Sequence, residues 1–438
     1  MKRPLAAVLS AAVLLAAAPR AHADDAAQAQ LTELNRKVDA LTQEIEKLKL
    51  GDAAEAPAPA SQPGFGPSAS KVYGVRPDKI SFGGYGEFVY LAPSRRKQNG
   101  DVSGLKKTSD LQRFVLYTGY KFSDWILFNS EFEVEHAGTG QAGENRGEIG
   151  VEQAYLEFRP WKALGARVGH VIVPLGIVNE VHEPTAFHGV NRPSVETYII
   201  PSTWHQNGAG LFGEAGPFSY RTYALQSLSA AKTTDPASDG FSAANGILGS
   251  NTEGARSPSD DLAWASRLDA ALAPGVKAGA GLYLARADRG NSAATVPVTL
   301  WEAHAQAQWR GASARALYAE GTIGGASDLN VAQGFTGNQS IGRRLFGGYA
   351  EASFDAFTLL PDAKGQSLSP FVRYERYDTQ WRVPAGFAKD PANSRVEYTL
   401  GLSYKPIAQV VLKLDQQWKR NQARTGVNQW NFGAGYIF

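Results

Sequence analysis

The last eleven residues, Asn428–Phe438, read NQWNFGAGYIF and decide the fold class. Alternate residues of this stretch form two faces. The apolar face consists of Trp430, Phe432, Ala434, Tyr436 and Phe438, and the small, polar face consists of Gln429, Asn431, Gly433 and Gly435. A period of two is the pattern of a β-strand, and a strand between lipid and water has two such faces. The stretch therefore predicts a membrane-spanning strand at the end of the chain.

The N-terminus indicates export. Lys2 and Arg3 precede an apolar run over 5–18, and Ala21-His22-Ala23 fits an A-x-A cleavage site. Because the run is too short to span a bilayer, residues 1–23 are predicted to be a signal peptide; the alternative is a buried helix. Cleavage removes three basic and no acidic residues, so the formal net charge falls from +2 to −1 and does not indicate nucleic acid. The chain has no cysteine, so no disulfide stabilises it outside the cytoplasm.

Residues 24–50 carry a heptad repeat. The apolar residues follow spacings of 3-4-3-4-3, which form the a/d seam of a coiled coil: Leu31, Leu34, Val38, Leu41, Ile45 and Leu48. A short α-helical coiled coil in the periplasm is predicted, with a lone amphipathic helix as the alternative. Residues 51–77 are rich in Pro, Ala, Gly and Ser and are predicted to be an extended, mobile linker.

Residues 78–438 contain sixteen segments that resemble strands. They cover 80–90, 111–121, 124–135, 149–160, 163–173, 208–215, 218–227, 261–272, 276–287, 298–309, 312–321, 344–357, 369–379, 395–405, 409–420 and 427–438. Short and long connections alternate between them, as short periplasmic turns and long outer loops do in outer-membrane barrels. We therefore predict an all-β transmembrane barrel of 16 antiparallel strands. A large soluble sandwich or propeller is the alternative, but no repeat of blade length is present.

Charged residues alternate with apolar ones along these strands. A Lys or Arg facing lipid at mid-membrane costs roughly 2–4 kcal/mol, so the charged parity is predicted to face a wet lumen. The predicted pore wall consists of Arg113, Glu131, Glu133, Glu157, Arg159, Arg167, Glu302, Arg315 and Glu351.

The third outer loop, 174–207, is the candidate functional site. Four prolines and an apolar Ile199-Ile200 pair favour an ordered loop that folds into the lumen. Its titratable residues are predicted to form a pore constriction: Glu180, His182, Glu183, His188, Arg192, Glu196 and His205. A loop that only plugs or braces the barrel is the alternative. The His and Glu spacings match no compact ligand motif, so neither a metal nor a cofactor is predicted.

Several motifs together resemble the phosphate-selective porin family and its relatives with an N-terminal coiled coil. They are FGGYGEF at Phe82–Phe88, RVGHVIVPLG at Arg167–Gly176, PFVRYERYD at Pro370–Asp378 and the terminal Phe. The resemblance implies a sixteen-stranded passive channel that forms homotrimers, with segments 80–90 and 163–173 at the subunit interface. It also implies that barrel assembly machinery reads Tyr436 and Phe438.

The chain departs from the phosphate-specific members of that family. Those members carry a ladder of inward Arg and a Lys-rich constriction, whereas this loop has Arg192, no Lys and three Glu. Basic residues gather instead in the first outer loop, where they could steer anions, bind lipopolysaccharide phosphates or form a solvated tip: Arg95, Arg96, Lys97, Lys106 and Lys107.

The predicted function is passive diffusion of small hydrophilic solutes or ions across the bacterial outer membrane, with outer-membrane lipid, lipopolysaccharide and other copies of the chain as partners. A phosphate- or anion-selective porin and a structural tether of the outer membrane are the alternatives. An outer-membrane enzyme is not predicted, because the sequence has no G-x-S-x-G elbow.

Overall fold

A computed structural model describes residues 36–37, 62–138, 147–234, 237–252, 254–257, 259–288 and 294–438. The predicted signal peptide and the seam of the predicted coiled coil lie outside these residues, although Arg36 and Lys37 are helical. Within the described part of the chain, no helix has the length and apolar character to cross a membrane.

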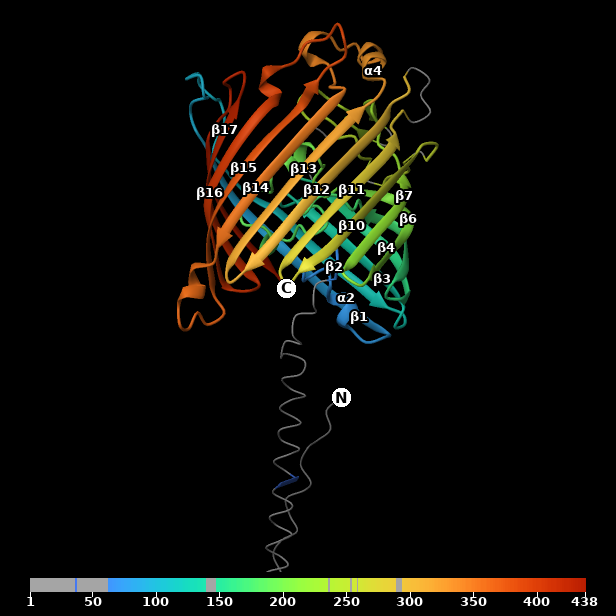
Figure 1. The fold of residues 1–438 in the computed structure, drawn as a ribbon, viewed down its shortest axis with the longest axis vertical. Helices are drawn as coiled ribbons and strands as arrows, with labels where there is room; N and C mark the ends of the chain where they lie inside the picture. The colour runs from blue at the N-terminus through green and yellow to red at the C-terminus, as the bar shows by residue number, and fades with distance from the viewer. Residues whose placement is uncertain are drawn as a thin grey trace, which may run out of the picture. The chain divides into compact units, whose positions relative to one another are not determined.

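The chain forms a closed barrel of sixteen antiparallel strands (Figure 1). The strands are β1 (Lys79–Pro93), β2 (Thr108–Lys121), β3 (Ile126–Glu135), β4 (Ile149–Trp161), β5 (Leu164–Ile172), β6 (His205–Ala215), β7 (Phe218–Gln226), β10 (Leu262–Ala273), β11 (Val276–Arg286), β12 (Pro297–Trp309), β13 (Ala312–Ile323), β14 (Arg344–Phe354), β15 (Ser367–Arg382), β16 (Ser394–Ile407), β17 (Val410–Asn421) and β18 (Gln429–Ile437). Each pairs with its neighbours in sequence, and β1 pairs with β18 to close the barrel, with Tyr85 opposite Ile437. The predicted fold class of the barrel is confirmed, and all sixteen predicted segments correspond to its strands.

Short helices and one small hairpin lie in the connections. They are α2 (Lys71–Gly74), α3 (Val195–Tyr198), α4 (Ala326–Ala332), the 3-10 turns Pro184–Ala186, Gly337–Gln339, Ala356–Leu359 and Pro391–Asn393, and the pair β8 (Thr233–Thr234) and β9 (Ala237–Ser238). With one exception, the long connections lie at one end of the barrel, here called the long-loop end; the connection 355–366 between β14 and β15 lies at the other end (Figure 1). The short turns, the start of β1 and the end of β18 lie at the other, the short-turn end (Figure 1).

The two faces of the wall follow the predicted alternation. On β12, Trp301, Ala303 and Ala305 are exposed on the outer face, whereas Glu302 and His304 are buried on the lumen side. The outer face of the barrel is therefore apolar, as lipid requires, and the lumen is polar.

The segment before β1 enters the barrel at the short-turn end. Phe65, Ala69 and Val72 are buried, and the Ser68 hydroxyl donates to the backbone oxygen of Phe438 over 2.7 Å. The second half of the predicted mobile linker is thus an ordered segment, 62–74, and this part of the prediction is wrong. The sequence offers only four apolar residues there, Phe65, Ala69, Val72 and Tyr73, too few to show a pattern, yet all four pack into the core inside the barrel.

Two wall glycines make room for this segment. A Cβ on Gly83 would lie 2.7 Å from the Ser68 hydroxyl, and a Cβ on Gly119 would lie 2.5 Å from the Val72 side chain. The close approach of segment 62–74 therefore accounts for these glycines within one chain, without the subunit interface that the resemblance implied for the first strand.

Candidate functional site

The connection between β5 and β6, residues 173–204, folds into the lumen. Its apolar residues are buried there, among them Leu175, Val195, Ile199 and Ile200, and α3 packs against β14 and β15. The loop is shorter than the predicted 174–207, because His205 pairs with Ile172 in the ladder of β6 with β5. His205 is therefore a wall residue rather than a loop residue.

Two loop glutamates fix the loop to the wall. The Glu180 carboxylate lies 2.8 Å from Arg221 and 3.5 Å from Arg267. Glu196 accepts from the Tyr349 hydroxyl at 2.6 Å and from the backbone N–H of Val178 at 2.7 Å. Both glutamates are buried. These predicted constriction charges therefore have structural partners and brace the loop.

Strands β15 and β17 also bind the loop. Asp415 accepts from the Val190 N–H at 2.6 Å, and Glu375 accepts from the Val195 N–H at 3.2 Å. Lys413 donates to the Gly189 carbonyl at 3.0 Å. Asp415, Glu375 and Lys413 were not among the predicted site residues, although the alternation of β15 and β17 places them on the lumen parity and could have identified them.

The remaining loop residues differ in their surroundings. His188 contacts the Ser353 hydroxyl at 2.9 Å, and its burial lowers its pKa to about 4, so it is neutral at pH 7. Arg192 donates to the hydroxyls of Ser202 and Thr203. The loop thus closes on itself at Arg192.

Glu183 joins the loop to segment 62–74. One carboxylate oxygen accepts the N–H groups of Ser68 and Ala69, both at 2.9 Å. Burial is the main cause that raises the pKa of Glu183 to about 7. The loop and the N-terminal segment therefore meet inside the barrel through a carboxyl that titrates near neutral pH.

The predicted wall residues all face the lumen, and most form ion pairs. Arg167 lies 2.8 Å from Glu157, Arg315 lies 2.8 Å from Glu351, and Arg113 lies 3.1 Å from Glu87. The others are Arg159 with Glu157 and Glu133 with Arg113, while Glu131 lies 3.0 Å from His182 and Glu302 lies 2.8 Å from His304. A ladder of unpaired arginines, which phosphate-specific porins would need, is not found among the described wall residues named here.

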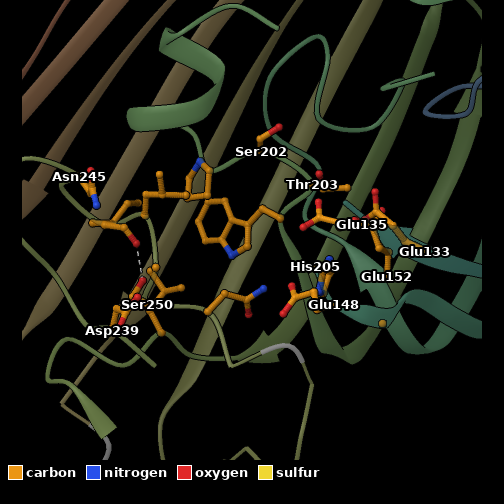
Figure 2. A pocket seen from close by; sticks show the side chains of 18 of the residues that line it. Glu133, Glu135, Glu148, Glu152, Ser202, Thr203, His205, Asp239, Asn245 and Ser250 are labelled. Carbon is orange, nitrogen blue, oxygen red and sulfur yellow. Dashed lines mark hydrogen bonds between the residues drawn. The ribbon is translucent and has the colours of Figure 1, made fainter. Parts of the chain in front are cut away.

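An acidic vestibule lies at the long-loop end (Figure 2). It is a cavity of about 520 Å³ whose described lining includes five carboxylates and His205 but no Lys or Arg. Four of these carboxylates, Glu133, Glu135, Glu148 and Glu152, gather with His205 on one side of the cavity, and Asp239 lies on the other side (Figure 2). This region has the chemistry to attract cations.

A mixed vestibule lies at the short-turn end. It is a cavity of about 510 Å³ lined by residues 62–65 and by both signs of charge: Glu180, Glu214 and Asp269 with Arg221, Arg267, Lys277 and Arg315. Most of these charges are paired, as Asp269 is with Arg221 at 2.8 Å.

Comparison with known proteins adds a relative and a set of similar barrels. No family model matches the chain. An uncharacterized protein of Aquifex aeolicus (strain VF5) is 34% identical over 358 residues, which cover 80% of this chain and 78% of that protein.

The solved structures with a similar fold are outer-membrane porins and channels. Salmonella typhi OmpF in complex with daunomycin has a TM-score of 0.51 at 11% identity, covering 82% of this chain and 98% of OmpF. The anion-selective porin from Comamonas acidovorans has a TM-score of 0.50 at 11% identity (82% and 99%), and the outer membrane channel DcaP of Acinetobacter baumannii has 0.50 at 12% (82% and 97%). These identities support the fold alone. The chain therefore belongs to the same family as the Aquifex aeolicus protein, and its barrel has the fold of the outer-membrane porins.

Proposed function

We propose that the chain is an outer-membrane porin, through which small hydrophilic solutes or ions diffuse passively. The observation that carries this proposal is the loop 173–204, which is hydrogen-bonded to opposite sides of a closed lumen and has a polar cavity at each end. A loop held in this way sets the width of the passage without needing to move, because its glutamates and backbone already have partners on the wall.

The proposed charge selectivity rests on the charges that line the cavities. The acidic vestibule presents carboxylates without Lys or Arg in its described lining. Fixed charges at the mouth of a narrow passage raise the local concentration of the opposite ion. We therefore propose that the channel favours cations. Phosphate selectivity is the weaker candidate, since Arg167, Arg315 and Arg113 are each held by a carboxylate.

The proposal includes a location and partners. The apolar outer face suits outer-membrane lipid, and exposed Trp125, Trp161 and Trp309 at the short-turn end suit its interface with water. Barrel assembly machinery, lipopolysaccharide and two further copies of the chain remain the proposed partners, on the resemblance stated above.

The test is electrical. The mature protein is refolded, its barrel is verified by heat-modifiable mobility on a gel, and it is added to a planar bilayer under a KCl gradient. We expect stepwise openings, in groups of three if the protein is a trimer, and a reversal potential that favours K⁺.

Two results would change the proposal. A strong anion preference with block by added phosphate would restore phosphate selectivity. Folded protein that never conducts would refute the channel and favour a structural tether.

A further inference from the structure

Three buried side chains from separate elements converge beside the acidic vestibule. His182 comes from the loop, Glu131 from β3 and Glu152 from β4. The His182 Nε2 atom lies 3.0 Å from Glu131 and 3.7 Å from Glu152, and the three candidate ligand atoms all lie within 4.8 Å of one another. Each residue is at least nine-tenths buried.

The hydrogen bonds around His182 select the nitrogen that could bind an ion. Its Nδ1 lies 2.9 Å from the carbonyl oxygen of Asn179, so Nδ1 carries a proton and donates. In neutral His182 the Nε2 atom then presents a lone pair to the Glu131 oxygen, and two lone pairs at 3.0 Å repel. A cation between them removes the repulsion; so does a proton on Nε2. Gln153 donates to the other Glu131 oxygen at 2.7 Å and fixes that carboxylate, as outer partners do at metal sites.

A polar group beside these three residues lacks a partner. The Tyr85 hydroxyl has no hydrogen-bond partner among the described residues, and Tyr85 is fully buried. The Tyr85 ring contacts that of His182, with centroids 6.0 Å apart. Buried polar groups without a partner are rare because each costs about 1–3 kcal/mol, so a bound water or ion is the usual explanation for one.

The charges around the cluster do not balance. The carboxylates of Glu87, Glu131, Glu133 and Glu152 lie near Tyr85 or its neighbour Arg113. Arg113 pairs with two of them, and Arg192 is a second arginine that acts on Glu133. Even a protonated His182 leaves an excess of negative charge in a buried place, and a divalent cation would balance it.

We propose that His182 Nε2, Glu131 and Glu152 bind one divalent cation of the zinc class. One imidazole nitrogen and two carboxylate oxygens are a ligand set that Zn²⁺ accepts, with a further position for water, whereas Ca²⁺ and Mg²⁺ prefer oxygen ligands alone. The Tyr85 hydroxyl supplies a hydrogen-bonding group beside the ion. The cation would tie loop 173–204 to β3 and β4.

An ion can reach this site from the long-loop end. Glu152 and Glu133 both line the acidic vestibule, and Glu135, Glu148 and Asp239 line the same cavity. These carboxylates would concentrate divalent cations at the entrance to the site.

The test measures metal content and does not depend on conductance. The full mature chain is prepared without a polyhistidine tag, treated with a chelator, and dialysed against ZnCl₂. Elemental analysis and equilibrium dialysis should give one Zn²⁺ per chain, retained in a tenfold excess of CaCl₂ or MgCl₂. The chain has no cysteine, so thiols cannot account for bound zinc.

Matched variants locate the ion. His182→Gln and Glu152→Gln should each weaken Zn²⁺ binding at least about tenfold, since even loss of an outer-shell partner costs about 10–100-fold. His188→Gln, the same change elsewhere in the loop, should retain one Zn²⁺. If His182→Gln fails to fold, Glu152→Gln decides, because it keeps the shape of the side chain and removes a charge.

Three outcomes would overturn the proposal. Folded wild-type protein that holds no more Zn²⁺ than His182→Gln would show that the cluster is an imidazolium ion pair. Equal binding by wild type and Glu152→Gln would place the zinc elsewhere. Displacement of Zn²⁺ by a tenfold excess of Ca²⁺ would refute the zinc class.

Discussion

The two vestibules have similar volumes but hold their charges differently. At the short-turn end, Glu180 and Asp269 lie 2.8 Å from Arg221. At the long-loop end, the described lining offers carboxylates and no Lys or Arg. A lining that contains both signs of charge has a small net field, whereas a lining with charges of one sign contributes its field to passing ions. The mixed vestibule is therefore expected to anchor the loop, and the acidic vestibule to select ions.

The largest effect is expected when the mixed vestibule loses Arg221, the side chain that pairs with both Glu180 and Asp269. Arg221→Met leaves Glu180 and Asp269 with one fewer partner, and breaking a buried pair in this way costs about 3–5 kcal/mol. We expect a lower midpoint of guanidinium-induced unfolding, followed by tryptophan fluorescence, and noisier single channels.

Lys277→Met is the matched control. Lys277 lines the same vestibule, is exposed, and forms no ion pair among the described residues. If the control destabilises the barrel as much as Arg221→Met does, the anchoring role assigned to the mixed vestibule is wrong.

The second effect concerns segment 62–74, whose first residues line the mixed vestibule. Val72 is 1% exposed and packs against Gly119. Val72→Asp places a charge there at a cost of several kcal/mol, so we expect the segment to leave the barrel. Single-channel conductance should rise, and protease should cleave within 62–74.

The exposed Arg76 supplies the control for that experiment. Arg76→Asp introduces the same side chain four residues away, and should leave both conductance and cleavage as in the wild type. Unchanged conductance in Val72→Asp, with cleavage increased, would show that the segment does not narrow the passage.

The third effect is a pH dependence of the same segment. Docking buries Glu183 and raises its pKa from 4.5 to about 7, so the docked state binds the proton more tightly. The resulting stabilisation is complete below pH 4.5 and is lost as the pH rises to about 7; its upper limit is about 3 kcal/mol. Conductance should therefore be higher at pH 8 than at pH 5.5.

Glu183→Gln isolates this carboxyl, because a neutral amide keeps the segment docked at either pH. The difference in conductance between the wild type and Glu183→Gln should appear only above about pH 6. A difference that is the same at pH 5.5 and pH 8 would exclude Glu183 as the titrating group.

The sequence predicts the wall far better than it predicts the contents of the lumen. Alternation is a local property of each strand, so it identified all sixteen strands and the inward side of residues such as Glu131 and Arg315. The partners of a loop depend on long-range folding. Glu152 was not predicted because β4 is irregular there. Glu131 pairs with Gln153 but Phe132 pairs with Val151, so the alternation of inward and outward side chains shifts by one residue at Glu152. The ordered position of segment 62–74 was not predicted, because the segment has no periodic pattern.

The smallest effect tests the acidic vestibule itself. The double variant Glu135→Gln and Glu148→Gln removes two carboxylates that lie outside the proposed zinc ligands. We expect the reversal potential under a KCl gradient to move toward zero at 0.1 M salt. The shift should nearly vanish at 1 M salt, because the screening length falls from about 10 Å at 0.1 M to about 3 Å at 1 M.

Glu214→Gln is the control, because Glu214 lines the mixed vestibule and lies 3.5 Å from Lys162. If this control shifts the potential as far as the double variant does, then a carboxylate beside basic residues and carboxylates in the acidic lining act alike on passing ions, and the distinction between the two vestibules fails.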